Sequence, residues 1–216
     1  MKPLASCIVL LLVTGCPGPA SSGDDQHTPD AAVDGAAHLD APVAGCPLAM
    51  TMTDAGMIAA FKAQRCNVPG SGGTQKWYRL SAQLATTGDY VQLELWPNLG
   101  AFTGAVTTGT FTIGGNDAAY TTCGVCGRAL GDKGQAAQKE YFATSGTVNV
   151  TAVGAAGQPI AATLTNIGFV EVNGTTHDPI ASGCAAALAG IQISGTVVDV
   201  GGGGGGGGSC PTTVGD

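Results

Sequence analysis

Apolar and polar residues alternate along two neighbouring stretches, 76–84 and 89–96, and this alternation predicts two β-strands. The more apolar face of the pair consists of Tyr78, Leu80, Ala82, Leu84, Val91, Leu93 and Leu95. The opposite face consists of Trp77, Arg79, Ser81, Gln83, Tyr90, Gln92, Glu94 and Trp96. The pattern therefore predicts one face that packs into a core and a second face of aromatic and polar side chains.

The segment from Ala85 to Gly88 fits a four-residue hairpin loop between these strands. With that loop the register is fixed, because a shift by one residue would exchange the two faces. The apolar pairs are then Tyr78–Leu95, Leu80–Leu93 and Ala82–Val91, and the pairs on the other face are Trp77–Trp96, Arg79–Glu94, Ser81–Gln92 and Gln83–Tyr90. One register thus produces an aromatic pair, an ion pair and polar pairs, which supports it.

Further strands are predicted at 105–113, 118–124, 140–153, 159–172 and 190–200, separated by turns rich in glycine or containing proline. A short helix is predicted over 54–65, because Thr53 and Asp54 can cap its start and Lys62 and Arg65 lie near its end. We therefore expect an all-β fold, an antiparallel sandwich or partly closed barrel, with one short N-terminal helix.

The composition agrees with this class. The chain has 216 residues with 36 glycines, only 5% aromatic and 11% charged residues, and a formal charge of −7. No basic cluster occurs, which argues against a nucleic-acid partner. Residues 17–45 contain almost no large apolar side chain, so we expect 16–45 to form a disordered tether before a β domain at 46–200 and a glycine-rich tail at 201–216.

An apolar run from Leu4 to Val13 follows Met1-Lys2-Pro3, which is the layout of a secretory signal and too short to span a bilayer. The next residues, Val13-Thr14-Gly15-Cys16, resemble the lipobox of bacterial lipoproteins. That resemblance implies removal of residues 1–15, acylation of Cys16 and, with Pro17 in the second position, placement at the outer membrane. The alternatives are an ordinary signal peptide and an N-terminal anchor with a fortuitous cysteine.

Six cysteines remain in the predicted mature domain, and in an exported chain they indicate three disulfides with 15 open connectivities. They are Cys46, Cys66, Cys123, Cys126, Cys184 and Cys210. The Cys123-Gly124-Val125-Cys126 motif also occurs in redox centres and in halves of zinc sites. No βαβ pattern surrounds it and the compartment is oxidising, so structural disulfides are favoured and neither a metal nor a cofactor is expected.

The candidate binding face consists of Trp77, Arg79, Tyr90, Glu94 and Trp96, because flat rings beside hydrogen-bonding side chains suit stacking on sugars or on an extended chain. Alternatively, a second sheet or the predicted helix covers both tryptophans, and they belong to the core.

Catalytic signals are weaker. His177 is the one histidine of the domain, no GxSxG motif accompanies it, and a polar surface turn is the favoured interpretation. A glycosidase would need two carboxylates, for which Glu94 and Glu140 are candidates. Glu171-Val172-Asn173-Gly174-Thr175 resembles an extended bacterial N-glycosylation site, with a strand-end turn as the alternative.

In layout the chain resembles bacterial lipoproteins that carry one cysteine-stapled β domain on an Asp- and Ala-rich tether. The sequence thus predicts a membrane-anchored, non-enzymatic module that binds glycan, peptidoglycan or another envelope protein. The alternatives are a cell-envelope hydrolase and a purely structural envelope component.

Overall fold

The structure is a computed structural model that describes residue 46 and the ranges 51–52, 57–59, 62–84 and 88–200. All of these residues belong to the second of two compact units, which comprises His38–Asp216. The signal segment with Cys16, the tether, the glycine-rich tail and Cys210 lie outside the described residues.

The described strands form one 11-stranded sheet in the order β1-β10-β9-β8-β7-β5-β4-β3-β11, with β2 also pairing with β10 and β6 with β8. Most neighbours are antiparallel, whereas β1 and β2 run parallel to β10 and β11 runs parallel to β3. The strands are β1 (Thr51–Met52), β2 (Met57–Ala59), β3 (Lys62–Asn67), β4 (Lys76–Gln83), β5 (Tyr90–Leu95), β6 (Gly109–Ile113), β7 (Val125–Gly131), β8 (Lys139–Val153), β9 (Pro159–Val172), β10 (Ala185–Thr196) and β11 (Val198–Asp199). The all-β prediction is confirmed.

The hairpin of β4 and β5 has the register predicted from the alternation. Tyr78 pairs with Leu95, Leu80 with Leu93 and Ala82 with Val91, and the polar pairs on the other face follow the same register. The backbone N–H of Leu84 donates to the carbonyl oxygen of Asp89 at 2.9 Å, which closes the turn. The alternation and the length of the turn therefore predict correctly which residues of the hairpin pair with each other.

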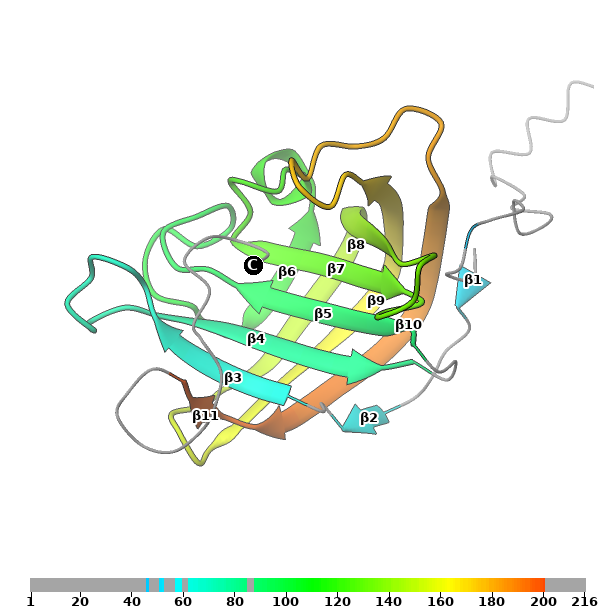
Figure 1. Ribbon diagram of the computed structural model, residues 1–216. Helices are drawn as coiled ribbons and strands as arrows, with labels where there is room; N and C mark the ends of the chain where they lie inside the picture. The colour runs from blue at the N-terminus through cyan, green and yellow to red at the C-terminus, as the bar shows by residue number, and fades with distance from the viewer. Residues whose placement is uncertain (1–45, 47–50, 53–56, 60–61, 85–87, 201–216) are drawn as a thin grey trace, which may run out of the picture. The chain divides into compact units, whose positions relative to one another are not determined.

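The sheet curls strongly, so that β8, β9 and β10 pass behind the layer of β3, β4, β5 and β7 (Figure 1). The face inside the curl is the main core. It joins Leu80, Leu93 and Val125 of the front strands to Leu164 of β9 and Ile191 of β10, all of them at most 1% exposed. The long strands β8 and β9 supply most of the curved wall, and their register shifts at Ala143/Ser145, Ser145/Thr147 and Val150/Ala152. Such bulges increase the local bend of a strand.

The opposite, convex face of β4, β5, β7 and β8 carries a second hydrophobic cluster. Its buried members are Cys66, Trp77, Trp96, Tyr120, Cys123, Cys126, Phe142, Val172 and Val200. Antiparallel sheets commonly pack one face against the core and leave the other face in contact with water. In this protein both faces of the front strands are buried over part of their length, because loops fold back over the convex side.

Two local predictions are wrong. In place of a helix over 54–65, the structure has strands β2 and β3, and β3 pairs with β4 from Lys62↔Ser81 to Asn67↔Lys76. A short isolated helix is marginal in water, whereas the edge of β4 offers a full row of backbone partners. The predicted strand at 118–124 is instead a loop that begins with the 3₁₀ helix η1 (Gly115–Ala118), and the strand starts only at Val125.

Two disulfides are placed among the described cysteines. Cys46 bonds to Cys184 with Cα atoms 5.7 Å apart, and Cys123 bonds to Cys126 with Cα atoms 5.4 Å apart. Cys66 is disulfide-bonded as well. The prediction that these cysteines form structural disulfides is confirmed for the five described ones.

Candidate functional site

A buried carboxylate organises the convex face. Glu94 of β5 is fully buried, and its Oε1 accepts hydrogen bonds from Arg79, at 2.8 Å from Nε and 2.6 Å from Nη2. Its Oε2 accepts the indole N–H of Trp96 at 2.9 Å. Arg128 of β7 approaches from the other side, 3.7 Å from Oε1. A buried charge is tolerated only with such partners, so three strands are locked together by their polar side chains.

The ion pairs continue toward β8. Arg128 Nη2 lies 3.2 Å from Glu140 Oε2, and the same oxygen lies 3.8 Å from Nδ1 of His177. Acidic and basic side chains therefore alternate from β4 to the loop after β9, in the order Arg79, Glu94, Arg128, Glu140 and His177. The arrangement places the imidazole of His177 at the end of this row.

His177 stacks on Tyr120, although the two residues come from different loops. Their ring centroids are 3.9 Å apart and the ring planes differ by 10°. Tyr120 lies in the loop that enters β7, and His177 lies in the 173–184 loop, which folds back from the end of β9 (Figure 1). His177 has a φ of +59°, a left-handed backbone that non-glycine residues seldom adopt. Strained positions of this kind cluster at functional sites.

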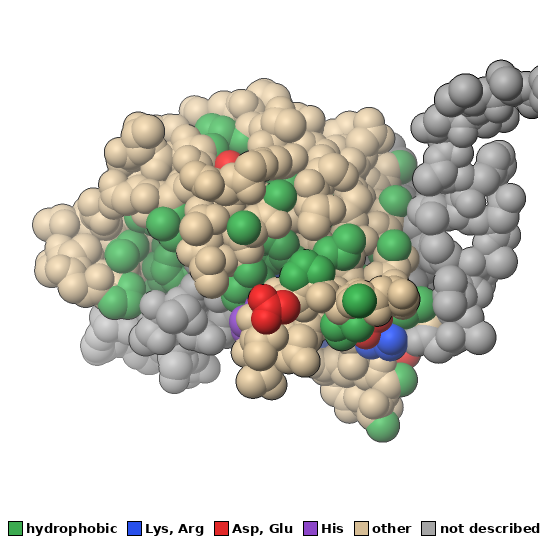
Figure 2. Space-filling model, turned by 90° about the horizontal axis from the view of Figure 1, so that it is seen from above, with side chains coloured by type: hydrophobic (Ala, Val, Ile, Leu, Met, Phe, Trp, Pro, Cys, Tyr) green, Lys and Arg blue, Asp and Glu red, His purple; other side chains and the backbone are tan. Residues whose placement is uncertain are grey.

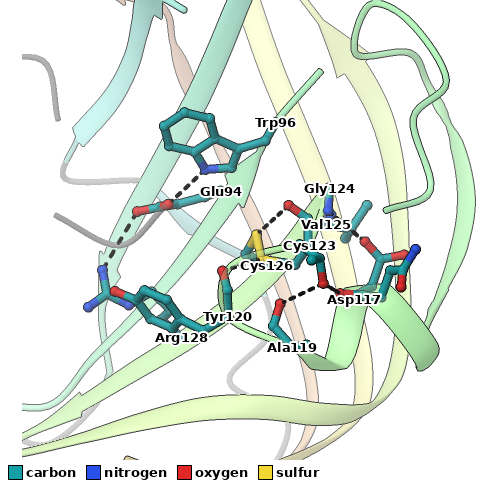
Figure 3. The surroundings of a disulfide bond; sticks show 12 residues. Glu94, Trp96, Asp117, Ala119, Tyr120, Cys123, Gly124, Val125, Cys126 and Arg128 are labelled. Atoms are coloured by element: carbon teal, nitrogen blue, oxygen red, sulfur yellow. Dashed lines mark hydrogen bonds and ion pairs between the residues drawn. A yellow bond between two sulfur atoms is a disulfide. The ribbon is translucent and has the colours of Figure 1, made fainter. Parts of the chain in front are cut away.

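The loop that carries Tyr120 is held rigidly. The Asp117 carboxylate oxygen Oδ1 accepts the backbone N–H groups of Gly124 at 2.7 Å and Val125 at 2.9 Å. The Cys123–Cys126 disulfide ties the next turn to β7 (Figure 3). A Cβ on Gly124 would lie 2.1 Å from the carbonyl oxygen of Leu99, so only glycine fits this approach of the two segments. Tyr120 therefore comes from a loop fixed by side-chain, backbone and covalent bonds.

A cavity of about 580 Å³ opens between four loops next to this stack. The rings of Trp96, Tyr120 and His177 line it together with smaller apolar groups such as Pro97 and Leu99. Its volume lies within the range of about 300–1,000 Å³ that is usual for small-molecule sites. The cavity is therefore large enough to hold a ligand.

The polar groups of this cavity are amides and hydroxyls. Asn98 Nδ2 donates to Gln75 Oε1 at 2.7 Å, which leaves an N–H of Gln75 and the carbonyl oxygen of Asn98 for a ligand. Thr121 and Thr176 supply hydroxyl groups. The described lining residues include no Lys, Arg, Asp or Glu. The titratable residues among them are Tyr120 and His177. Charged side chains are also sparse on the face seen in Figure 2.

A second cavity, of about 240 Å³, lies on the other side of the stacked pair. Both cavities share Tyr120, Thr121, Thr176 and His177. The smaller one is otherwise bounded by Phe142 and Val172 of the second hydrophobic cluster, and by exposed loop residues that include Ala119 and Asp178. The stacked rings therefore form a partition between two hollows.

The sequence-predicted binding face is only partly assembled. Trp77 and Trp96 stack with centroids 4.6 Å apart, but Trp77 is fully buried and Trp96 is 4% exposed. Arg79 and Glu94 are taken up by the buried ion pairs. Tyr90 lies apart, where Lys133 approaches its ring at 5.0 Å. Of the five residues, only Trp96 lines either of these two cavities, so the site lies at the edge of the predicted face.

Sequence reasoning missed the loop residues of the site. Tyr120 was hidden in a predicted strand, although the turn signal Gly114-Gly115-Asn116-Asp117 directly before it marks a loop. For His177 the sequence favours a polar surface turn, whereas the structure places its ring on Tyr120 in the cavity wall. Gln75 and Asn98 belong to no sequence motif. Each lies in a separate connection between strands, and only the fold brings them together.

The geometry offers little support for a hydrolase, a metal site or the glycosylation site. Glu94, a candidate acid for a hydrolase, is fully buried and bonded to Arg79 and Trp96, and Glu140 is paired with Arg128. Within the described ranges, no group of three His, Cys, Asp or Glu side chains is arranged to hold a metal ion, and no helix is both long and apolar enough to cross a membrane. Asn173 accepts the N–H groups of Thr175 and Thr176 in a turn, while Glu171 is buried beside Lys139.

Comparison with known proteins returned no matching family model, no matching curated protein and no matching solved structure.

Proposed function

We propose that the domain is a non-enzymatic binding module whose ligand is a neutral pyranose sugar, held in the cavity of about 580 Å³. The observation that carries this proposal is the composition of the cavity wall. Its described residues combine three rings with amides and hydroxyls and include no permanently charged side chain. This combination suits a ligand that has both apolar C–H faces and uncharged hydroxyl groups.

The aromatic groups favour a sugar over a peptide. The indole N–H of Trp96 is already donated to Glu94, its ring stacks on Trp77 and it is 4% exposed, so Trp96 offers the cavity only a small apolar part of its ring. A peptide would bring backbone amides that need donors and acceptors along its length. The Gln75–Asn98 pair instead offers amide N–H groups and the carbonyl oxygen of Asn98 side by side, which suits adjacent hydroxyl groups of a sugar ring.

The module is proposed to work at the cell envelope. The lipobox-like residues Val13-Thr14-Gly15-Cys16 support a lipid anchor at Cys16, and the disulfide-bonded cysteines support an oxidising compartment. An outer-membrane location would bring the cavity within reach of envelope glycans and peptidoglycan. Export and lipidation are tested by labelling cells with a palmitate analogue. Label should appear on the wild-type chain and vanish in Cys16→Ser.

The binding proposal is tested on the full-length protein with an array of neutral and acidic glycans. We expect binding to neutral sugars that contain glucose or N-acetylglucosamine, and no binding to the acidic set. Asn98→Gly should weaken binding, because it removes the amide but keeps a residue that tolerates the φ of +61° at this position. Failure to bind any neutral sugar would overturn the proposal.

Asn166→Gly is the matched control. Asn166 has a φ of +52°, is exposed and lies in β9 away from both cavities. It should leave binding unchanged, so a loss of binding in both variants would point to a general effect of the substitution and contradict the assigned site.

A further inference from the structure

We infer that the two cavities are consecutive subsites for one oligosaccharide, with the Tyr120–His177 stack standing between two sugar units. This inference rests on the proposed sugar-binding function and extends it from a single ring to a chain. The two cavities share four lining residues, so they lie next to each other.

The size of the smaller cavity supports this reading. At about 240 Å³ it lies below the usual range for an independent small-molecule site, whereas the larger cavity lies within it. The smaller cavity is thus better suited to hold one further unit of a ligand that is already bound next door than to hold a ligand of its own.

An oligosaccharide chain would cross the wall between the two cavities at its exposed rim. Thr121 and Thr176 line both cavities and are exposed, so they form the rim that the linkage between two units would pass. Tyr120 and His177 are stacked nearly parallel and are only slightly exposed, so the partition below that rim is fixed. Tyr120 is 9% exposed, with His177 stacked on it and Arg128 5.4 Å from its ring centroid, so it offers a unit in either cavity only a small part of its ring.

The smaller cavity also differs in charge. The exposed residue Asp178 lines it and is absent from the wall of the larger one. A carboxylate there would repel an acidic sugar. The ligand class is therefore an oligosaccharide of at least two uncharged units, with single sugars as weaker ligands.

Chain length provides the test. Titration calorimetry on the full-length protein would compare N-acetylglucosamine, chitobiose and chitotetraose, and in parallel glucose, cellobiose and cellotetraose. We expect the Kd to fall about tenfold from one unit to two in the series that binds, and to change little beyond that. Equal affinity for one and two units would overturn the two-subsite inference but leave the proposed function standing. No binding in either series, together with no binding to any neutral sugar of the array, would overturn both.

A variant that fills the smaller cavity separates the two subsites. Ala119 is exposed and lines only that cavity, so Ala119→Trp should raise the Kd of the disaccharide to that of the single sugar and leave single-sugar binding unchanged. Ala136→Trp, on an exposed loop away from both cavities, is the control for adding a large ring. Disaccharide binding unaffected by Ala119→Trp, with wild-type melting, would contradict the inference.

Discussion

Trp77 and Trp96 stack with their ring planes only 5° apart, yet their indole N–H groups have different surroundings. Trp96 donates its N–H to Glu94 at 2.9 Å, whereas the N–H of Trp77 is buried and has no acceptor among the residues that the structure describes. Two like residues at paired positions of one hairpin therefore hold different polar roles, and this difference can be measured.

Replacing each tryptophan with phenylalanine should reveal that difference. Trp77→Phe removes ring volume from a packed cluster and should cost about 1–2 kcal/mol of unfolding free energy. Trp96→Phe should cost about 1.5–3 kcal/mol more, because it also removes a hydrogen bond to a buried carboxylate. Denaturant unfolding of both variants measures this. Equal losses would show that the bond to Glu94 contributes nothing.

Neutralising Glu94 should be among the most damaging single changes. Glu94→Gln leaves Arg79 without the carboxylate that receives two of its nitrogens, and we expect a loss of about 3–5 kcal/mol. The paired variant Arg79→Met/Glu94→Gln should recover part of that loss, because no buried charge of that pair remains. The readout is the coupling energy of a double-mutant cycle. A well-folded Glu94→Gln protein that lost a hydrolytic activity would instead support the hydrolase alternative.

The two placed disulfides should differ in their contribution. The Cys46–Cys184 bond spans 138 residues of sequence, and removing it by Cys→Ala changes at both positions should cost about 4–5 kcal/mol through loop entropy. The Cys123–Cys126 bond spans only 3, and the same account gives about 2 kcal/mol. Thermal unfolding of both double variants tests this order. A larger loss of stability in the Cys123/Cys126 variant would contradict the entropic account.

The third bond can be assigned by peptide mapping of the non-reduced protein. Cys66 is disulfide-bonded, and we predict Cys210 as its partner. The backbone N–H of Val200 donates to the carbonyl oxygen of Arg65 at 2.9 Å, so the last described residue before Cys210 lies next to the neighbour of Cys66. A peptide that links Cys66 to Cys7 or Cys16 would contradict this pairing. It would also contradict the proposed removal of residues 1–15 or the proposed acylation of Cys16.

Two aspartates should give opposite responses to pH. Burial raises the pKa of Asp89 above its ordinary value of 3.8, despite the hydrogen bond from the N–H of Asp132. Hydrogen bonding to Arg65 lowers the pKa of Asp199 below that value. Ionisation of Asp89 therefore costs stability as the pH rises through its folded pKa, whereas the contribution of Asp199 is present above 3.8 and is lost as the pH falls through its lowered pKa.

Amide substitutions test these signs through melting temperatures at about pH 2 and pH 7. Asp89→Asn should raise Tm at the higher pH, because it keeps an acceptor for Asp132 without the buried charge. Asp199→Asn should lower Tm at the higher pH, by the equivalent of no more than about 1 kcal/mol, since the pair is partly exposed. The difference between each variant and the wild type should shrink at the lower pH.

The sequence was most informative where structure is local. The β4–β5 register could be predicted because one short turn and the period-two alternation determine it together. Strand β3 could not, since Ala63 and Cys66 are buried at a spacing that also fits one helix face, and only the pairing with β4 decides between the two. Tertiary pairing overrode local propensity there.

The candidate site was less predictable for the same reason. Trp96 can be identified because it directly follows β5 and continues the alternating pattern of that strand. Tyr120 and His177 lie in separate loops, and their stacking depends on how each loop folds back over the convex face. Alternation along a strand carries no information about such a meeting.

The Cys46–Cys184 bond also determines how the domain would bear a mechanical load. A pull on the chain ahead of Cys46 passes through the sulfur atoms directly to Cys184, at the start of β10, without peeling any strand from the sheet. The N–H of Cys184 donates to the Glu171 carboxylate at 2.7 Å, at the base of the loop that carries His177. Tension applied ahead of Cys46 would thus reach the base of the loop that carries His177 along a short covalent path.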